Sequence, residues 1–322
     1  MNSGLSRVFQ LAQRFSRFAV VLSVLVFALL RVLNLNLAIG AQITIALLAL
    51  ALGIPHGAID HLITLPATPR SRFVLFIVGY ITIAVLAGIG IASWNLHGFQ
   101  LVLLMSALHF GIGDAAYANE WRDSQGLARH PWFVEISYAL PAGLLPVILP
   151  LTDSRSLSAL NRINLSLGNW AGSHGSAIRQ VTLVLAAIGL LITLVVRATD
   201  FAIDLIVLVL LAEITPPLVT FAMYFGCWHA VRHTARLVPK LPRALKAATD
   251  NHTRQAYSAA IVPGLYAVVG TLALGGALMI WDPHSFGSGL FWSTLVIVWS
   301  LTVPHMMTTA RFDWRAIHFS RS

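Results

Sequence analysis

The sequence predicts an all-α integral membrane protein, a helix bundle with about ten transmembrane helices, and three observations support this fold class. Of the 322 residues, 57% are hydrophobic and only 10% are charged, whereas a water-soluble domain carries about 25% charge. The apolar residues form segments of roughly 20, long enough to cross about 30 Å of hydrocarbon at about 1.5 Å per residue. The net charge of +9 comes from short basic clusters between these segments, a pattern typical of membrane loops rather than of a nucleic-acid-binding surface.

The first helix is expected near residues 18–34. It follows Arg7, Arg14 and Arg17 and superficially resembles a signal peptide, but no small-residue cleavage site follows it, so we predict an uncleaved helix. The remaining helices are expected near residues 37–55, 73–94, 97–118, 132–150, 178–197, 201–215, 216–237, 257–281 and 289–309.

Two features leave the helix count between nine and ten. The break at Thr215-Pro216-Pro217 is either a kink or the turn of a re-entrant pair. The gap from Leu151 to Gly175 is too short for a soluble domain, and we expect a surface helix with a Gly-Ser turn there. One transmembrane domain therefore covers residues 1–322.

The distribution of Lys and Arg predicts the orientation in an inner (plasma) membrane. With the N-terminus inside, the cytoplasmic loops and the C-terminal tail hold Arg70, Arg72, Arg122, Arg129, Arg197, Arg236, Lys240, Arg243, Lys246, Arg254, Arg311, Arg315 and Arg321. Only Arg155 and Arg162 fall on the opposite side. We therefore expect both termini in the cytoplasm and prefer ten helices to nine.

Histidine is unusually frequent, since 12 His equal the 12 Asp and Glu together. Six lie in expected loops or at polar ends: His97, His130, His174, His252, His284 and His318. The other six are in or at the ends of apolar helices: His56, His61, His109, His229, His233 and His305. In the predicted topology, the helices that carry this second group all run from outside to inside, with the histidines in their C-terminal halves.

This shared depth predicts a metal site in the cytoplasmic half of the membrane. His229 and His233 are spaced i, i+4 and so lie on one helix face, about 5 to 6 Å apart at Cβ. Polar side chains in hydrocarbon are costly unless they are paired or functional. The alternative for each single His is an interhelical hydrogen bond.

The chain limits the metal to nitrogen and oxygen ligands, because Cys227 is its single cysteine. Neutral imidazoles suit iron, copper, zinc or nickel. Four such ligands leave coordination positions open for an anion or an oxygen species, and a substrate that arrives from the bilayer would be a lipid or isoprenoid.

Several acids lie near these histidines in the sequence. Asp60 and Asp114 follow His56 and His109 by four and five residues and are expected to orient ligating imidazoles or to form helix-terminal hydrogen bonds. Asp204 and Glu213 have no obvious partner and are weaker candidates for a ligand or an ion pathway.

The motifs Gly53–Asp60, His109–Asp114, His229–His233 and Pro304–Met306 resemble those of the Brp/Blh-type β-carotene 15,15′-dioxygenases of bacteria and archaea. The resemblance extends over nearly the whole chain in order and spacing. It implies a multi-helix membrane enzyme that binds non-haem Fe²⁺ and uses O2 to split the central double bond of β-carotene into two molecules of retinal.

The family's iron ligands correspond to His56, His109, His229 and His233, the catalytic and metal-binding residues that we expect here. Asp60, Asp114, Tyr224 and His305 are candidates for orienting ligands or for polar contacts near the metal. Phe110 and Trp228 are candidates for stacking on the polyene, or they pack the helices. A retinal-forming enzyme would serve a rhodopsin, and the resemblance leaves the preferred carotenoid open.

Two other functions fit less well. A metal or proton-coupled transporter would stagger its histidines through the membrane and show inverted repeats, and we find no clear repeat. A di-iron desaturase or hydroxylase would need HxxHH-type clusters, which this sequence lacks.

Overall fold

The computed structural model describes residues 3–65, 69–153, 161, 167–281 and 290–317, and within these ranges it is helical without a strand. The longer helices are α1 (Ser3–Val32), α2 (Ile39–Gly57), α4 (Arg70–Gln125), α5 (Trp132–Val147), α7 (Gly175–Val195), α8 (Thr199–Ile214), α13 (Leu265–Trp281) and α15 (Leu290–Ile317). The shorter ones are α3 (Asp60–Thr64), α9 (Pro217–Ala222), α10 (Ala230–Leu237), α11 (Pro242–Thr249) and α12 (Thr253–Ile261). A π-helix, η4 (Met223–His229), and the 3₁₀ turns η1 (Leu149–Thr152), η3 (Gly172–His174), η5 (Val238–Lys240) and η6 (Val262–Gly264) complete the description. The predicted all-α class is confirmed.

Six helical stretches among the described residues are long and apolar enough to cross a membrane. They are Ser3–Val32, Ile39–Thr64, Arg70–Trp94, Leu96–Gln125, Gly172–Val195 and Thr253–Trp281. Their outer faces expose large apolar side chains, such as Leu25, Leu86 and Leu191, as lipid-facing helices do. The protein is therefore a helical membrane protein, while the predicted count of about ten spans is not confirmed: α5 and α8, for example, have only 16 residues each.

The α1 helix begins much earlier than predicted. It starts at Ser3 rather than near residue 18, so that Arg7, Arg14 and Arg17 lie inside it. Arg17 remains in the helix because its guanidinium bonds to Asp204 of α8 at 2.8 Å. The distant partner of Arg17 cannot be recognised from the local sequence, in which these arginines resemble the polar flank of a helix.

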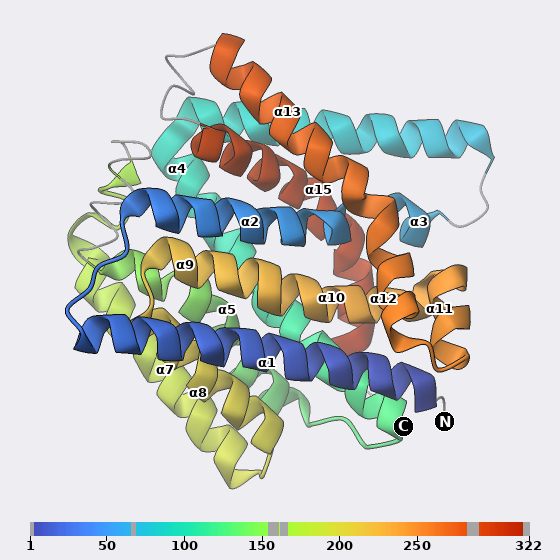
Figure 1. Cartoon of the computed structure of the whole chain (residues 1–322), viewed down its shortest axis with the longest axis horizontal. Helices are drawn as coiled ribbons and strands as arrows, with labels where there is room; N and C mark the ends of the chain where they lie inside the picture. Colours follow the sequence, from blue (N-terminus) through green and yellow to red (C-terminus); the bar gives the residue numbers. More distant parts are fainter. Residues whose placement is uncertain (1–2, 66–68, 154–160, 162–166, 282–289, 318–322) are drawn as a thin grey trace.

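The α4 helix bends back on itself between its two membrane-length halves. A Cβ atom at Gly98 would lie 2.8 Å from the Cα of Ile91, although seven residues of straight helix span roughly 10 Å. In Figure 1 the first half of α4 lies along the top of the molecule and the second half descends through the bundle. The two helices predicted at 73–94 and 97–118 are thus the two arms of one bent element.

The predicted break at Thr215-Pro216-Pro217 separates two helices. α8 ends at Ile214, Thr215 and Pro216 are extended, with ψ of 153° and 149°, and α9 begins at Pro217. Proline is well tolerated there because the first helical N–H groups have no intrahelical acceptor. From Pro217 the chain then continues through α9, η4 and α10 to Leu237.

The helices that carry the histidines run in parallel. Figure 1 shows α2, the α9–α10 segment and α15 passing in the same direction, while α1 runs oppositely. Leu5 of α1, Ser124 of α4 and Ala316 of α15 line a single polar cavity of about 690 Å³, so α1 begins where α4 and α15 end. The surface helix expected between Leu151 and Gly175 lies largely outside the described residues.

Candidate metal centre

Five of the six helix-associated histidines meet inside the bundle. His56 comes from α2, His109 from α4, His229 from the end of η4, His233 from α10 and His305 from α15. Each is at most 5% exposed. Their neighbouring ring centres are separated by 5.1 to 6.5 Å. The structure therefore joins the four predicted ligands and His305 in one group, which we call the histidine cluster.

His61 does not join this cluster. Its ring packs against that of Phe73 at 5.9 Å, on the first arm of α4. It lines the apolar cavity described below, however, so it lies close to the site without sharing the contacts of the other five.

The π-helix η4 immediately precedes His229, and a single widened turn of this kind is often found at functional sites. His229 and His233 stay on one face of the following helix, with ring centres 5.8 Å apart. Two glycines allow α2 and α4 to approach the rings of Phe225 and His229 in η4. A Cβ at Gly53 would overlap the Phe225 ring at 2.0 Å, and one at Gly113 would lie 3.1 Å from Cε1 of His229.

The cluster contains ring nitrogens that have no protein partner. Among the described side chains, Nε2 of His109, His229 and His305 and both nitrogens of His233 are buried without a hydrogen bond. A buried polar atom that lacks a partner costs about 1–3 kcal/mol. Because four histidines of the cluster each have an unpaired ring nitrogen, the cluster suits a metal ion, which accepts several nitrogen ligands.

The spacing of the rings is compatible with one ion. A metal–nitrogen bond of about 2.0–2.1 Å and tetrahedral angles place two imidazole centres roughly 5.3 Å apart. His56 lies at 5.3 Å from His305 and at 5.1 Å from His233, and His109 lies at 5.1 Å from His229. As the described side chains stand, no three of them form a group that holds a metal ion. The separations of the rings therefore suit one metal ion, but their orientations do not. The rings would have to rotate for their nitrogens to point at a single ion.

The opposite nitrogens of two rings are held by the protein. Nδ1 of His305 lies 2.9 Å from the Asp60 carboxylate, and Nδ1 of His56 contacts the carbonyl oxygen of Gly53. Metal-binding histidines usually donate their second N–H to a carboxylate or carbonyl in this way. Asp60, at the start of α3, also accepts a hydrogen bond of 3.0 Å from the Tyr80 hydroxyl. Sequence reasoning missed Tyr80, although a lone tyrosine hydroxyl in an apolar run was a usable signal.

Asp114 lies in a different network. It accepts hydrogen bonds from the Tyr224 hydroxyl at 3.0 Å and from the Trp228 indole N–H at 2.7 Å. The Arg232 guanidinium lies 3.6 Å above the Trp228 ring. Asp114 and Tyr224 therefore anchor η4, which ends at His229, and Trp228 is fully buried between polar partners.

The two acids that appeared to lack partners are both in ion pairs, so this part of the interpretation was wrong. Asp204 pairs with Arg17 at 2.8 Å and with Arg232 at 2.7 Å. Glu213 pairs with Arg179 at 2.6 Å. Partners on other helices are invisible in the sequence.

A second buried ion network was missed by sequence reasoning. Asp313 of α15 bonds to Arg236 of α10 at 2.6 Å, and Arg236 also pairs with Glu120 of α4 at 3.1 Å. The other carboxylate oxygen of Asp313 lies 3.8 Å from Nδ1 of His109. The prediction of Arg236 in a cytoplasmic loop was wrong: it is fully buried in α10, four residues after Arg232, where a cation in the apolar core faces the protein interior.

An apolar cavity of about 260 Å³ opens beside the cluster. It lies among α2, the first arm of α4, α13 and α15 and is lined by Ile54, His56, Gly57, Ala58, Asp60, His61, Phe76, Ile77, Tyr80, His109, Phe110, Phe225, Ala267, Val298, Leu301, Thr302 and His305. Phe110 thus lies where a polyene-stacking residue was expected. Trp228 is not among the lining residues.

These features define a class of protein: a helical membrane protein with a buried histidine cluster at the wall of an apolar cavity. Comparison with known proteins gives its family. The family described as beta-carotene 15,15'-dioxygenase matches residues 47–313, and the chain belongs to this family of enzymes, as the motifs predicted.

Two relatives illustrate the range of similarity. The probable beta-carotene 15,15'-dioxygenase Blh of Halobacterium salinarum is 26% identical over 306 residues, covering 82% of each chain. The beta-carotene 15,15'-dioxygenase of uncultured marine bacterium 66A03 is 28% identical over 194 residues, covering 58% of this chain and 66% of the relative. No solved structure matches the chain.

Proposed function

We propose that this protein cleaves β-carotene, or a related carotenoid, at its central double bond to give two molecules of retinal, using O2 and a non-haem Fe²⁺. The observation that carries the proposal is the juxtaposition of a buried histidine cluster and an apolar cavity. His56, His109 and His305 belong to both. A substrate in the cavity would therefore touch the residues that hold the metal.

The ligands that we propose are His56, His109, His229 and His233. Imidazoles without thiolates suit iron, and when bound, iron would supply the redox chemistry with O2. His305 completes the ring of histidines and is held by Asp60. Whether His305 is a fifth ligand or a polar contact is decided by metal content in its alanine variant.

The cavity suits one arm of a polyene. His56 and His109 line it together with the rings of Phe110 and Phe225, whose centres are 6.1 Å apart. Apolar walls exclude water from the reacting bond, and rings beside it restrict the polyene to a few orientations. The lining residues of α4, α13 and α15 belong to helices with lipid-facing sides, so a carotenoid would enter laterally from the bilayer.

The cellular setting follows from the same proposal. The enzyme would be one transmembrane domain of an inner (plasma) membrane, with both termini in the cytoplasm and the metal in the cytoplasmic half. Its product is the chromophore of rhodopsins, which makes a retinal-binding rhodopsin a functional partner. Nucleic acid has no role in this function.

The clustering of the histidines also separates this function from the transporter alternative. A conduction path would place its polar groups at several depths. The five described rings instead gather around one point, with neighbouring ring centres no more than 6.5 Å apart. This arrangement favours a metal-dependent enzyme.

The proposal is tested by expressing the protein in cells that accumulate β-carotene. Loss of orange colour with the appearance of retinal is expected for the wild type and for His97→Ala, whose histidine is exposed and distant from the cluster. His109→Ala should leave carotene unchanged and bind less iron. Unaltered carotene in a well-expressed, iron-replete wild type would refute the activity, and metal uptake into liposomes without an oxygen-dependent product would favour a transporter.

A further inference from the structure

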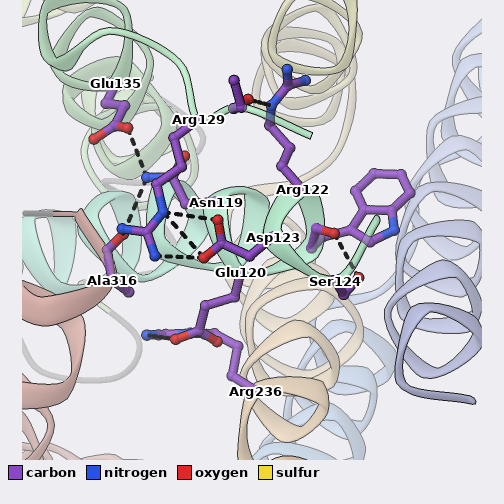
Figure 2. Close-up of polar contacts among 11 residues, drawn as sticks. Asn119, Glu120, Arg122, Asp123, Ser124, Arg129, Glu135, Arg236 and Ala316 are labelled. Atoms are coloured by element: carbon purple, nitrogen blue, oxygen red, sulfur yellow. Dashed lines mark hydrogen bonds and ion pairs between the residues drawn. The ribbon is translucent and has the colours of Figure 1, made fainter. Parts of the chain in front are cut away.

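The buried network beside His109 consists of three charged side chains from three helices. Arg236 is fully buried, and Asp313 is 3% exposed. Nη1 of Arg236 donates to Asp313 at 2.6 Å, and its Nε donates to Glu120 at 3.1 Å. Figure 2 shows the guanidinium of Arg236 directed toward the Glu120 carboxylate. The Glu120 side chain is 20% exposed. Burial of the other two charges, those of Arg236 and Asp313, is costly unless they are paired, so this arrangement needs a reason beyond packing.

The geometry around His109 supplies that reason. Its Nδ1 faces Asp313 at 3.8 Å, while its Nε2 is buried and has no partner in the described part of the chain. A shortening by about 0.8 Å would turn the first contact into an ordinary hydrogen bond. One ring nitrogen is thereby directed to a carboxylate and the other is left for the cluster.

The same arrangement occurs at His305, whose ring centre lies 5.2 Å from that of His109. Nδ1 of His305 faces Asp60 at 2.9 Å, and its Nε2 is unpaired. The two pairs interlock, because α15 supplies the histidine of one pair and the carboxylate of the other. A carboxylate that accepts a hydrogen bond from Nδ1 selects the tautomer in which Nε2 carries no proton, and Nε2 is then free to bind a metal.

The charges of these groups leave a net negative charge beside the cluster. Arg236 bonds to both Asp313 and Glu120, and Lys240 interacts electrostatically with Glu120 as well. With both cations counted, the three carboxylates of Asp313, Glu120 and Asp60 retain one negative charge. Asp60 bonds to the Tyr80 hydroxyl and to His305 and to no Lys or Arg among the described side chains.

We propose that Asp313 is a positioning residue that orients His109 for metal binding, and that the Glu120–Arg236–Asp313 network and Asp60 together supply negative charge that partly compensates a divalent metal ion. Neutral imidazoles cannot provide this compensation themselves, and it matters more inside a low-dielectric bundle than in water. The proposal rests on the metal site of the proposed function. It adds the residues that set the orientation of one ligand and the charge preference of the site.

Co²⁺ titration of the purified, metal-free protein tests this, with affinity measured by competition with a chelator and geometry by visible absorption. Asp313→Asn should weaken Co²⁺ binding about 10- to 100-fold, the usual effect of removing such a partner, and should alter the absorption bands. Asp313→Glu should restore much of both. Glu120→Gln removes one charge without touching His109, so it should weaken binding and leave the bands unchanged.

The matched control is Asp123→Asn on the same end of α4. Asp123 pairs with Arg129 at 2.5 Å and is exposed, away from the cluster, so the Co²⁺ affinity should stay at the wild-type value. Wild-type affinity and absorption in a folded Asp313→Asn protein would overturn the positioning role, and wild-type affinity in Glu120→Gln would overturn the charge argument. Failure of the wild type itself to bind Co²⁺ would instead refute the metal site, and this inference with it.

Discussion

Nδ1 of His305 lies 2.9 Å from the carboxylate of Asp60, although the two residues are 245 positions apart in the chain. The contact ties α15 to the start of α3. It also fixes which nitrogen of His305 faces the histidine cluster, where Nε2 has no partner among the described residues. Asp60, which follows His56 by four residues and was expected to orient a ligating imidazole or to form a helix-terminal hydrogen bond, therefore contacts a histidine from the other end of the protein.

The first prediction concerns this pair. Asp60→Asn should reduce metal affinity about 10- to 100-fold, because the amide is a poorer acceptor for the imidazole N–H. Tyr80→Phe, which removes one neutral hydrogen bond to the same carboxylate, should cost about 1 kcal/mol, or roughly fivefold. Iron content after dialysis against a chelator series measures both. Equal iron retention in Asp60→Asn and the wild type would contradict this role.

The second prediction concerns the apolar cavity. Ala267→Trp should lower kcat/KM for β-carotene about tenfold or more, because overfilling a packed site typically costs about 1–3 kcal/mol. Iron content should not change. Val269→Trp is the control on the same helix, since Val269 is 69% exposed on the lipid-facing side. Retinal formation in detergent micelles provides the assay, and full activity of Ala267→Trp would place the substrate elsewhere.

The third prediction concerns the packing of α4 on α5. A Cβ at Gly111 would lie 1.9 Å from the carbonyl oxygen of Ala139, so Gly111→Ala should lower the free energy of unfolding by about 1–3 kcal/mol. Gly90→Ala, on the same helix, has no atom within 4 Å of the added Cβ and should be neutral or slightly stabilising. Thermal unfolding in detergent compares the two. A Tm for Gly111→Ala equal to that of Gly90→Ala would contradict this helix contact.

The fourth prediction concerns metal and stability. Binding to the folded state alone stabilises by about 2.7 kcal/mol at a ligand concentration of 100 Kd, and here it would also satisfy buried ring nitrogens. Removal of metal by a chelator should therefore lower the Tm, and Fe²⁺ added without oxygen should restore it. The His233→Ala protein should show a much smaller shift. An identical shift in that variant would remove His233 from the ligand set.

Much of the site could be predicted because its signals are local. The pair His229 and His233 is readable from helical spacing alone, and the parallel direction of the histidine-bearing helices follows from counting the spans. His56 and His109 stand in specific motifs, which also indicated the family. Gly53 and Gly113, which belong to these motifs, lie at close contacts with Phe225 and His229.

The sequence by itself determined the membrane class, the family and the histidines that lie at one depth. These properties can be read from composition, local motifs and helical spacing, which depend only on residues close together in the chain. Only the tertiary structure decided that Asp60 contacts His305, that Asp313 faces His109 and that Arg17 and Arg232 neutralise Asp204. These contacts join helices far apart in the chain. Their existence depends on which faces of those helices meet, and that is set by the packing of the whole bundle rather than by any local pattern.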